Sequence, residues 1–261
     1  MSGWRTMSGP SVADLRRVAQ PAGHLERRNG EHWAGVLYMR RLSIYVTWLM
    51  ARTRVTPNQL TWVMTVAGVL AGFVLALPGL WAAVAAALLI QVYLLLDCSD
   101  GELARWTGRT SLIGVYLDRV GAYFAEAAVL AGLGWRASAV LPDWYTVLGV
   151  AAALGAILIK AETDLVEVAR AKGGLPAAGE SGAVQFRSGL LGLGRRILSA
   201  TKFHRIVQPI ELSLLALATA VIDAVRGDLA ATRVLLVACF VAACLQVVLH
   251  LVSILASRRL A

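Results

Sequence analysis

Apolar residues along this chain gather into long runs that polar segments separate. We place six runs at residues 58–77, 80–97, 113–134, 144–163, 208–223 and 232–256. A helix rises about 1.5 Å per residue, so a run of about twenty residues can cross a hydrocarbon core of about 30 Å. A membrane β-barrel needs strands of alternating polarity, which runs such as 81–90 lack. The pattern predicts an all-α integral membrane protein with six transmembrane helices.

The polar part before the first run is predicted to contain one amphipathic helix. Residues 40–54 mix four arginines with Leu42, Tyr45 and Trp48, a composition typical of a helix that lies in the membrane interface. We therefore expect a polar tail at 1–35, a cytoplasmic interfacial helix at 36–57 and a six-helix domain at 58–261. Thr56 suits the cap of the first spanning helix and Pro57 its first position.

Composition supports a membrane protein and explains the basic charge without a nucleic acid. The 261 residues are 58% hydrophobic and 16% charged, whereas soluble domains carry about 25% charged residues. The net charge is +9, and 21 of the 25 Lys and Arg fall in segments that share one side if the N-terminus is cytoplasmic. We expect a multi-pass protein of the cell membrane, with a cytoplasmic N-terminus and no nucleic-acid partner.

Three carboxylates near the inner ends of the second and third runs predict a metal site. Asp97 and Asp100 are three residues apart and share a helical face. A tight reversal at 107–110 would bring Asp118 beside them. Carboxylates repel one another unless a cation lies between them, and oxygen ligands with phosphate suit Mg²⁺ or Mn²⁺. Glu102, which lies among them, is expected to be solvated at the membrane interface.

Small residues and one arginine lie between these acids. Gly101, Ala104 and Gly114 would let a bulky ligand approach the backbone. Arg105 has a planar set of donors that suits a phosphate. Together with the acids, these residues indicate a site for a metal-bound pyrophosphate on the cytoplasmic side.

The run from Asp97 to Asp118 resembles the signature of the CDP-alcohol phosphotransferase family, D-x2-D-G-x2-A-R-x8-G-x3-D-x3-D, at seven of its eight fixed positions. The resemblance implies a homodimeric six-helix fold and transfer of a substituted phosphoryl group from a CDP-linked donor to an alcohol, with release of CMP. It implies that Asp97, Asp100 and Asp118 hold Mg²⁺. It also implies that the nucleotide pocket is lined by Gly101, Ala104, Arg105 and Gly114.

One position departs from the signature, because Ala122 stands where the family has its last Asp. In the family that Asp is the usual candidate for the base. Three explanations are open. Glu126, one turn further along, substitutes for it beside Asp118; a water or a group on the acceptor takes the proton; or the chain binds without turnover or has been engineered at this position.

The function that follows is a phospholipid-type transferase, with a catalytically silent binding protein as the alternative. The expected donor is CDP-diacylglycerol or another CDP-alcohol, and the acceptor is an alcohol. A transporter is disfavoured, because transporter sites lie near the bilayer midplane, whereas these acids lie at the inner ends of the helices. Five cations are candidates for gripping a phosphate on the acceptor: Lys160, Arg195, Arg196, Lys202 and Arg205.

Overall fold

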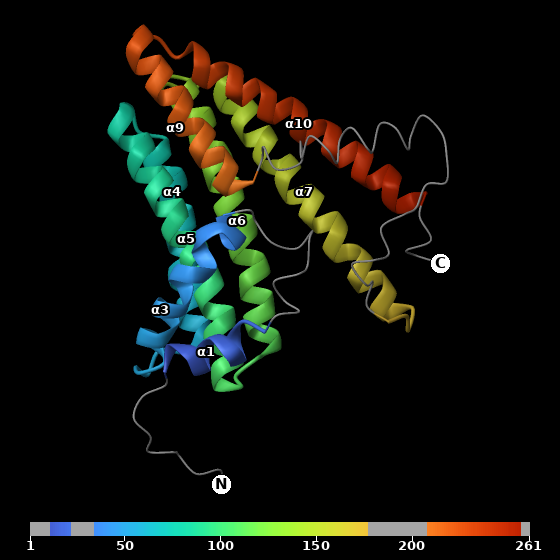
Figure 1. Ribbon diagram of the computed structural model, residues 1–261. Helices are drawn as coiled ribbons and strands as arrows, with labels where there is room; N and C mark the ends of the chain where they lie inside the picture. Colours follow the sequence, from blue (N-terminus) through green and yellow to red (C-terminus); the bar gives the residue numbers. More distant parts are fainter. Residues whose placement is uncertain (1–10, 22–33, 177–207, 257–261) are drawn as a thin grey trace. The chain divides into compact units, whose positions relative to one another are not determined.

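A computed structural model describes residues 11–21, 34–176 and 208–256, and these residues contain helices and no strand (Figure 1). A short helix α1 (Val12–Ala19) comes first, followed by a π-helical turn η1 (Gly35–Met39) and α3 (Arg40–Met50). The long helices are α4 (Pro57–Leu75), α5 (Leu80–Thr107), α6 (Leu112–Ala137), α7 (Trp144–Lys172), α9 (Pro209–Arg226) and α10 (Ala230–Leu255). The all-α prediction is confirmed.

Local sequence signals explain where these helices begin and end. Thr56 Oγ1 accepts a hydrogen bond from the Gln59 amide, and Gln59 Oε1 accepts one from the Thr56 amide, so this pair caps α4 as its sequence predicts. Asp143 and Thr146 cap α7 in the same reciprocal way. Between α5 and α6, Gly108 adopts a φ of 65°, a left-handed conformation that glycine adopts without strain. The expected reversal at 107–110 is therefore present.

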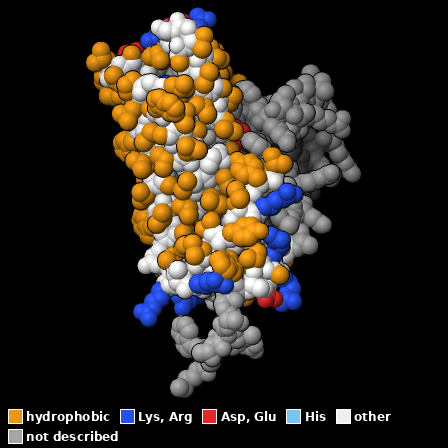
Figure 2. All heavy atoms as spheres, turned by 60° about the vertical axis from the view of Figure 1, so that its left-hand side comes forward, with side chains coloured by type: hydrophobic (Ala, Val, Ile, Leu, Met, Phe, Trp, Pro, Cys, Tyr) orange, Lys and Arg blue, Asp and Glu red, His pale blue; other side chains and the backbone are white. Residues whose placement is uncertain are grey.

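Four of the described helices are long and apolar enough to cross a membrane: α4, α5, α7 and α10. Helices form at all six predicted places, but α6 and α9 do not meet the same criterion. Charged residues interrupt both, among them Arg119 and Glu126 in α6 and Glu211 and Asp223 in α9. Six spans were thus predicted, and four are supported by length and composition. Hydrophobic side chains dominate the face that Figure 2 shows.

The predicted interfacial helix corresponds to η1 and α3, but its environment differs from the prediction. Ser43, Ile44 and Thr47 are fully buried within the protein. Leu42 and Tyr45 are exposed on other sides of the same helix. The polar side chains Ser43 and Thr47 are buried because a carboxylate of α5 accepts their hydrogen bonds. The structure therefore supports a helix that packs against the protein on one side, and not a helix that only rests on lipid.

The described helices fall into two compact units, residues 1–68 with 88–122 and residues 69–87 with 123–261. In the first unit, α1 packs on α3, and both lie against the C-terminal part of α5 (Figure 1). The segment 1–35, predicted as a polar tail, therefore contains a docked helix. In the second unit, α10 packs along α7 and also contacts α9.

Glycines let helices of the second unit approach closely. A Cβ at Gly132 would lie 2.1 Å from the carbonyl oxygen of Gly72, and one at Gly134 would lie 2.7 Å from the Cα of Gly149. Both distances are far below van der Waals contact. Backbone atoms thus occupy the space that any side chain would need, as expected where small residues form a helix interface in a membrane.

We expect Gly132→Ala to destabilise the protein by roughly 1–3 kcal/mol, because the added methyl group forces two backbones apart. Gly173→Ala is the matched control, since a Cβ there would meet its nearest atoms at 3.5 Å. The measurement is the thermal unfolding midpoint of each detergent-purified variant. Equal midpoints for the two variants would show that the close approach of Gly132 and Gly72 is absent.

Candidate functional site

A cavity of about 200 Å³ lies in the first unit, where the start of α4, the end of α5 and the start of α6 meet. Six of the residues predicted from the sequence line it, namely Asp100, Gly101, Ala104, Arg105, Gly114 and Asp118. The helical spacing of the motif and the reversal after Thr107 explain why residues from two helices converge here. The predicted nucleotide-site residues therefore share one cavity.

The two carboxylates of the cavity differ in their surroundings. Asp100 is buried, and Thr61 of α4 donates a hydroxyl hydrogen bond of 2.5 Å to its Oδ2. Asp118 is exposed, and its negative charge acts unfavourably on Asp100. Two carboxylates that repel each other in one cavity provide oxygen ligands for a cation.

The third predicted metal ligand, Asp97, is not among the residues that line the cavity. Over the described parts of the chain, no group of three or more His, Cys, Asp and Glu side chains is arranged to hold a metal ion. Mg²⁺ commonly binds to one or two carboxylates together with substrate phosphates. The pair Asp100 and Asp118 fits that mode, whereas the structure does not bring all three aspartates together.

Groups suited to an anion lie on the same cavity. A Cβ at Gly101 would lie 3.3 Å from Nη1 of Arg105, so the guanidinium lies over this glycine. Arg109 adds a second cation to the lining. Ser111 caps α6, with its Oγ accepting from the Gly114 amide at 3.0 Å, and the start of a helix favours negative charge. Cations and carboxylates together suit a phosphate with a divalent ion.

Sequence reasoning missed several residues of the lining: Asn58, Thr61, Arg109, Thr110 and Ser111. Asn58 and Thr61 lie three residues apart near the start of α4, so they share a helical face. That spacing is a usable signal, but the sequence analysis assigns neither residue to the site. A Cβ at Gly114 would lie 3.1 Å from Asn58 Oδ1, which shows how closely α6 approaches this face.

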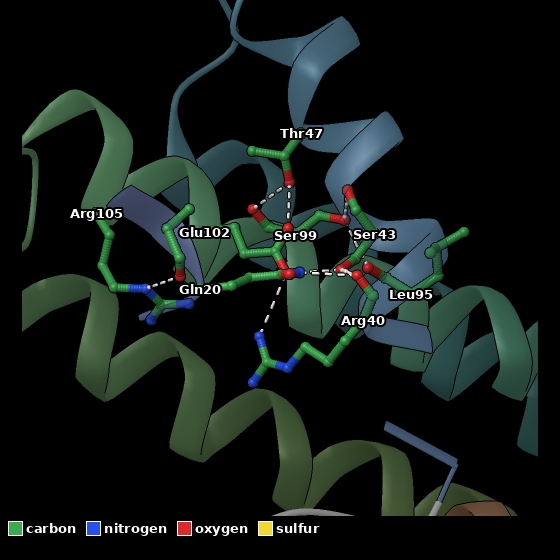
Figure 3. Close-up of polar contacts among 9 residues, drawn as sticks. Gln20, Arg40, Ser43, Thr47, Leu95, Ser99, Glu102 and Arg105 are labelled. Carbon is green, nitrogen blue, oxygen red and sulfur yellow. Dashed lines mark hydrogen bonds and ion pairs between the residues drawn. The ribbon is translucent and has the colours of Figure 1, made fainter. Parts of the chain in front are cut away.

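Behind the cavity, Glu102 is fully buried and accepts hydrogen bonds from four side chains (Figure 3). Its Oε1 accepts from Gln20 Nε2 at 2.7 Å, Ser43 Oγ at 2.6 Å and Arg40 Nη1 at 3.3 Å. Its Oε2 accepts from Thr47 Oγ1 at 2.8 Å. The expectation that Glu102 is solvated at the membrane interface is wrong, because α1 and α3 cover this face of α5.

The candidate base Glu126 lies in the second unit and does not line the cavity. Its Oε1 forms an ion pair of 2.8 Å with Nζ of Lys160, one of the predicted acceptor-binding cations. Tyr123 donates a hydrogen bond to Asp164 across the same two helices, α6 and α7. Four other acceptor-site candidates lie outside the described residues: Arg195, Arg196, Lys202 and Arg205.

Comparison with known proteins agrees with the resemblance seen in the sequence. A family model described as CDP-alcohol phosphatidyltransferase matches residues 54–258. A protein of Thermococcus kodakarensis, named a bifunctional IPC transferase and DIPP synthase, is 38% identical over 125 residues. That match covers 48% of this chain and 27% of the relative. The chain thus spans about a quarter of the relative's length.

We expect Glu102→Gln to destabilise the protein by about 3 kcal/mol, because a buried ion pair and its hydrogen bonds lose their acceptor charge. Asp14→Asn is the control, since Asp14 forms an ion pair with Arg17 on the exposed side of α1 and should change stability little. Thermal unfolding in detergent measures both. A Glu102→Gln midpoint equal to that of the native chain would contradict the described network.

Proposed function

The chain belongs to the CDP-alcohol phosphatidyltransferase family, and we propose that it transfers a substituted phosphoryl group from a CDP-linked donor to an alcohol and releases CMP. The observation that carries this proposal is the cavity where Asp100 and Asp118 lie with Arg105 and Arg109. Such a mixture of carboxylates and guanidinium groups matches a diphosphate that arrives with a divalent ion.

The proposed cofactor is Mg²⁺ or Mn²⁺, with Asp100 and Asp118 as ligands. Asp97 becomes a ligand only if its side chain turns toward the cavity. When bound, such an ion neutralises the diphosphate and stabilises the charge that develops on the leaving CMP. Arg105 and the start of α6 would orient the phosphates, and Gly101, Ala104 and Gly114 would leave room for the nucleotide.

A general base must accept the proton of the acceptor hydroxyl, and Ala122 cannot do so. Glu126 is paired with Lys160, so its carboxylate already has a cationic partner. We therefore favour a water or a group on the acceptor as the base. General base catalysis typically contributes about 10² to 10⁴-fold to a rate, so a chain without a dedicated base can retain turnover.

The donor and the setting are also part of the proposal. CDP-diacylglycerol is the proposed donor, because the chain is a membrane protein and could take it from the bilayer. All six predicted spans would then cross the membrane, with the cavity and the N-terminus on the cytoplasmic side. We propose a homodimer, as the family resemblance implies. The exposed face of α3, which carries Leu42 and Tyr45, would contact lipid.

The second candidate is a protein that binds a CDP-alcohol without turnover. The single observation in its favour is Ala122 at the position of the family's last Asp. Both candidates need a nucleotide pocket, so binding alone does not separate them. Release of CMP does.

We expect the native chain to release CMP from CDP-diacylglycerol when a divalent metal and one of a panel of alcohol acceptors are present. Asp118→Asn should lower that rate by roughly 10² to 10³-fold, because it removes a proposed ligand of the metal ion whose positive charge stabilises the transition state. Asp228→Asn, in an exposed ion pair with Arg226 outside the cavity and the N-terminal helices, is the matched control and should leave the rate unchanged.

Ala122→Asp completes the assay. Activity in the native chain means that residue 122 need not be an acid. Activity in Ala122→Asp alone would contradict the transferase proposal for this chain and identify it as a silenced relative.

A further inference from the structure

Arg105, which lines the cavity, is held by a residue that lies far outside the matched family domain. Its Nε donates a hydrogen bond of 2.7 Å to the carbonyl oxygen of Ala19, the last residue of α1. The last carbonyls of a helix have no partner within the helix and carry partial negative charge. The guanidinium of Arg105 therefore caps α1 while its Nη atoms lie over Gly101 in the cavity wall.

Two kinds of contact dock α1 where it can hold Arg105. Leu15 and Ala19 are fully buried together with Ile44 of α3, and Trp48 and Trp106 pack against this cluster. An eight-residue helix is not stable alone in water, so this packing is what orders it. The position of the Ala19 carbonyl thus depends on the apolar face of α1.

The polar contacts fix the register between α1 and α5. Gln20, directly after Ala19, donates to Glu102 and to the Arg40 carbonyl, each at 2.7 Å (Figure 3). Glu102 and Arg105 are three residues apart on one face of α5. The consecutive residues Ala19 and Gln20 therefore contact Arg105 and Glu102 of α5, respectively. A shift of α1 by one residue would break both contacts.

We propose that the docked residues Leu15 and Ala19 of α1, together with the adjoining Gln20, form a positioning element that orients Arg105 toward the phosphates of the donor. This inference rests on the proposed function, because it assumes that the cavity takes a CDP-linked diphosphate. Ala19 and Gln20 do not touch the donor and act through Arg105 and Glu102. Undocking α1 frees the guanidinium to rotate and weakens its charge-assisted hydrogen bond to a phosphate. The loss of this bond corresponds to about a tenfold weaker affinity for the donor.

The test is a double-mutant cycle on the binding of CDP to the full chain in detergent with Mg²⁺, measured by calorimetry. Leu15→Asn should undock α1, and Val18→Asn is the matched control because Val18 is 44% exposed on the same helix. Arg105→Lys removes the donor fork. We expect Leu15→Asn and Arg105→Lys each to weaken CDP binding about tenfold, and the double variant to be no weaker than either.

Two further variants separate positioning from loss of the fold. Leu15→Met should bind CDP as the native chain does, and Gln20→Leu, which removes only the polar anchor, should weaken binding several-fold while the protein stays folded. Native affinity in both Leu15→Asn and Gln20→Leu, or losses that multiply in the double variant, would overturn the inference. Absence of CDP binding by the native chain would instead contradict the proposed function.

Discussion

The first unit depends on one buried negative charge. Glu102 has no exposed surface, and Gln20, Arg40, Ser43 and Thr47 donate to it. Burying a carboxylate is costly unless charge and hydrogen bonds compensate, so these donors must stay in place. They belong to α3 and to the end of α1, which makes Glu102 the point where two N-terminal helices are joined to α5. The helix that carries Glu102 also carries the cavity residues.

This joint links the N-terminal segment to the site. Asp100 and Arg105 flank Glu102 on α5, and Thr61 and Ala19 hold them from α4 and α1. The cavity is thus built on a helix fixed from three sides, which limits the reorganisation needed when a charged ligand binds. The family model of the CDP-alcohol phosphatidyltransferases matches residues 54–258, so the Ala19 carbonyl that holds Arg105 comes from a segment before the matched region.

Local patterns predicted what depends on local sequence. The helices, the Thr56 cap, the reversal after Thr107 and the convergence of Asp100 with Asp118 all follow from spacing along neighbouring segments. The burial of Glu102 could not be predicted in this way, because its partners Arg40 and Gln20 lie 62 and 82 residues away. Helix α1 was missed because an eight-residue helix is not stable alone, and the residues that it packs against, such as Ile44 and Trp106, lie far along the chain. Apolar runs predicted spans at α6 and α9, but the charged residues in these two helices keep them from meeting the length and composition criterion that the other four long helices meet.

The most direct test of the account is the position of Mn²⁺ in crystals grown with CDP, located by its anomalous scattering. The account predicts a Mn²⁺ peak between the carboxylates of Asp100 and Asp118, with the CDP phosphates beside Arg105. Nucleotide bound outside this cavity, or a metal peak away from both aspartates, would contradict it.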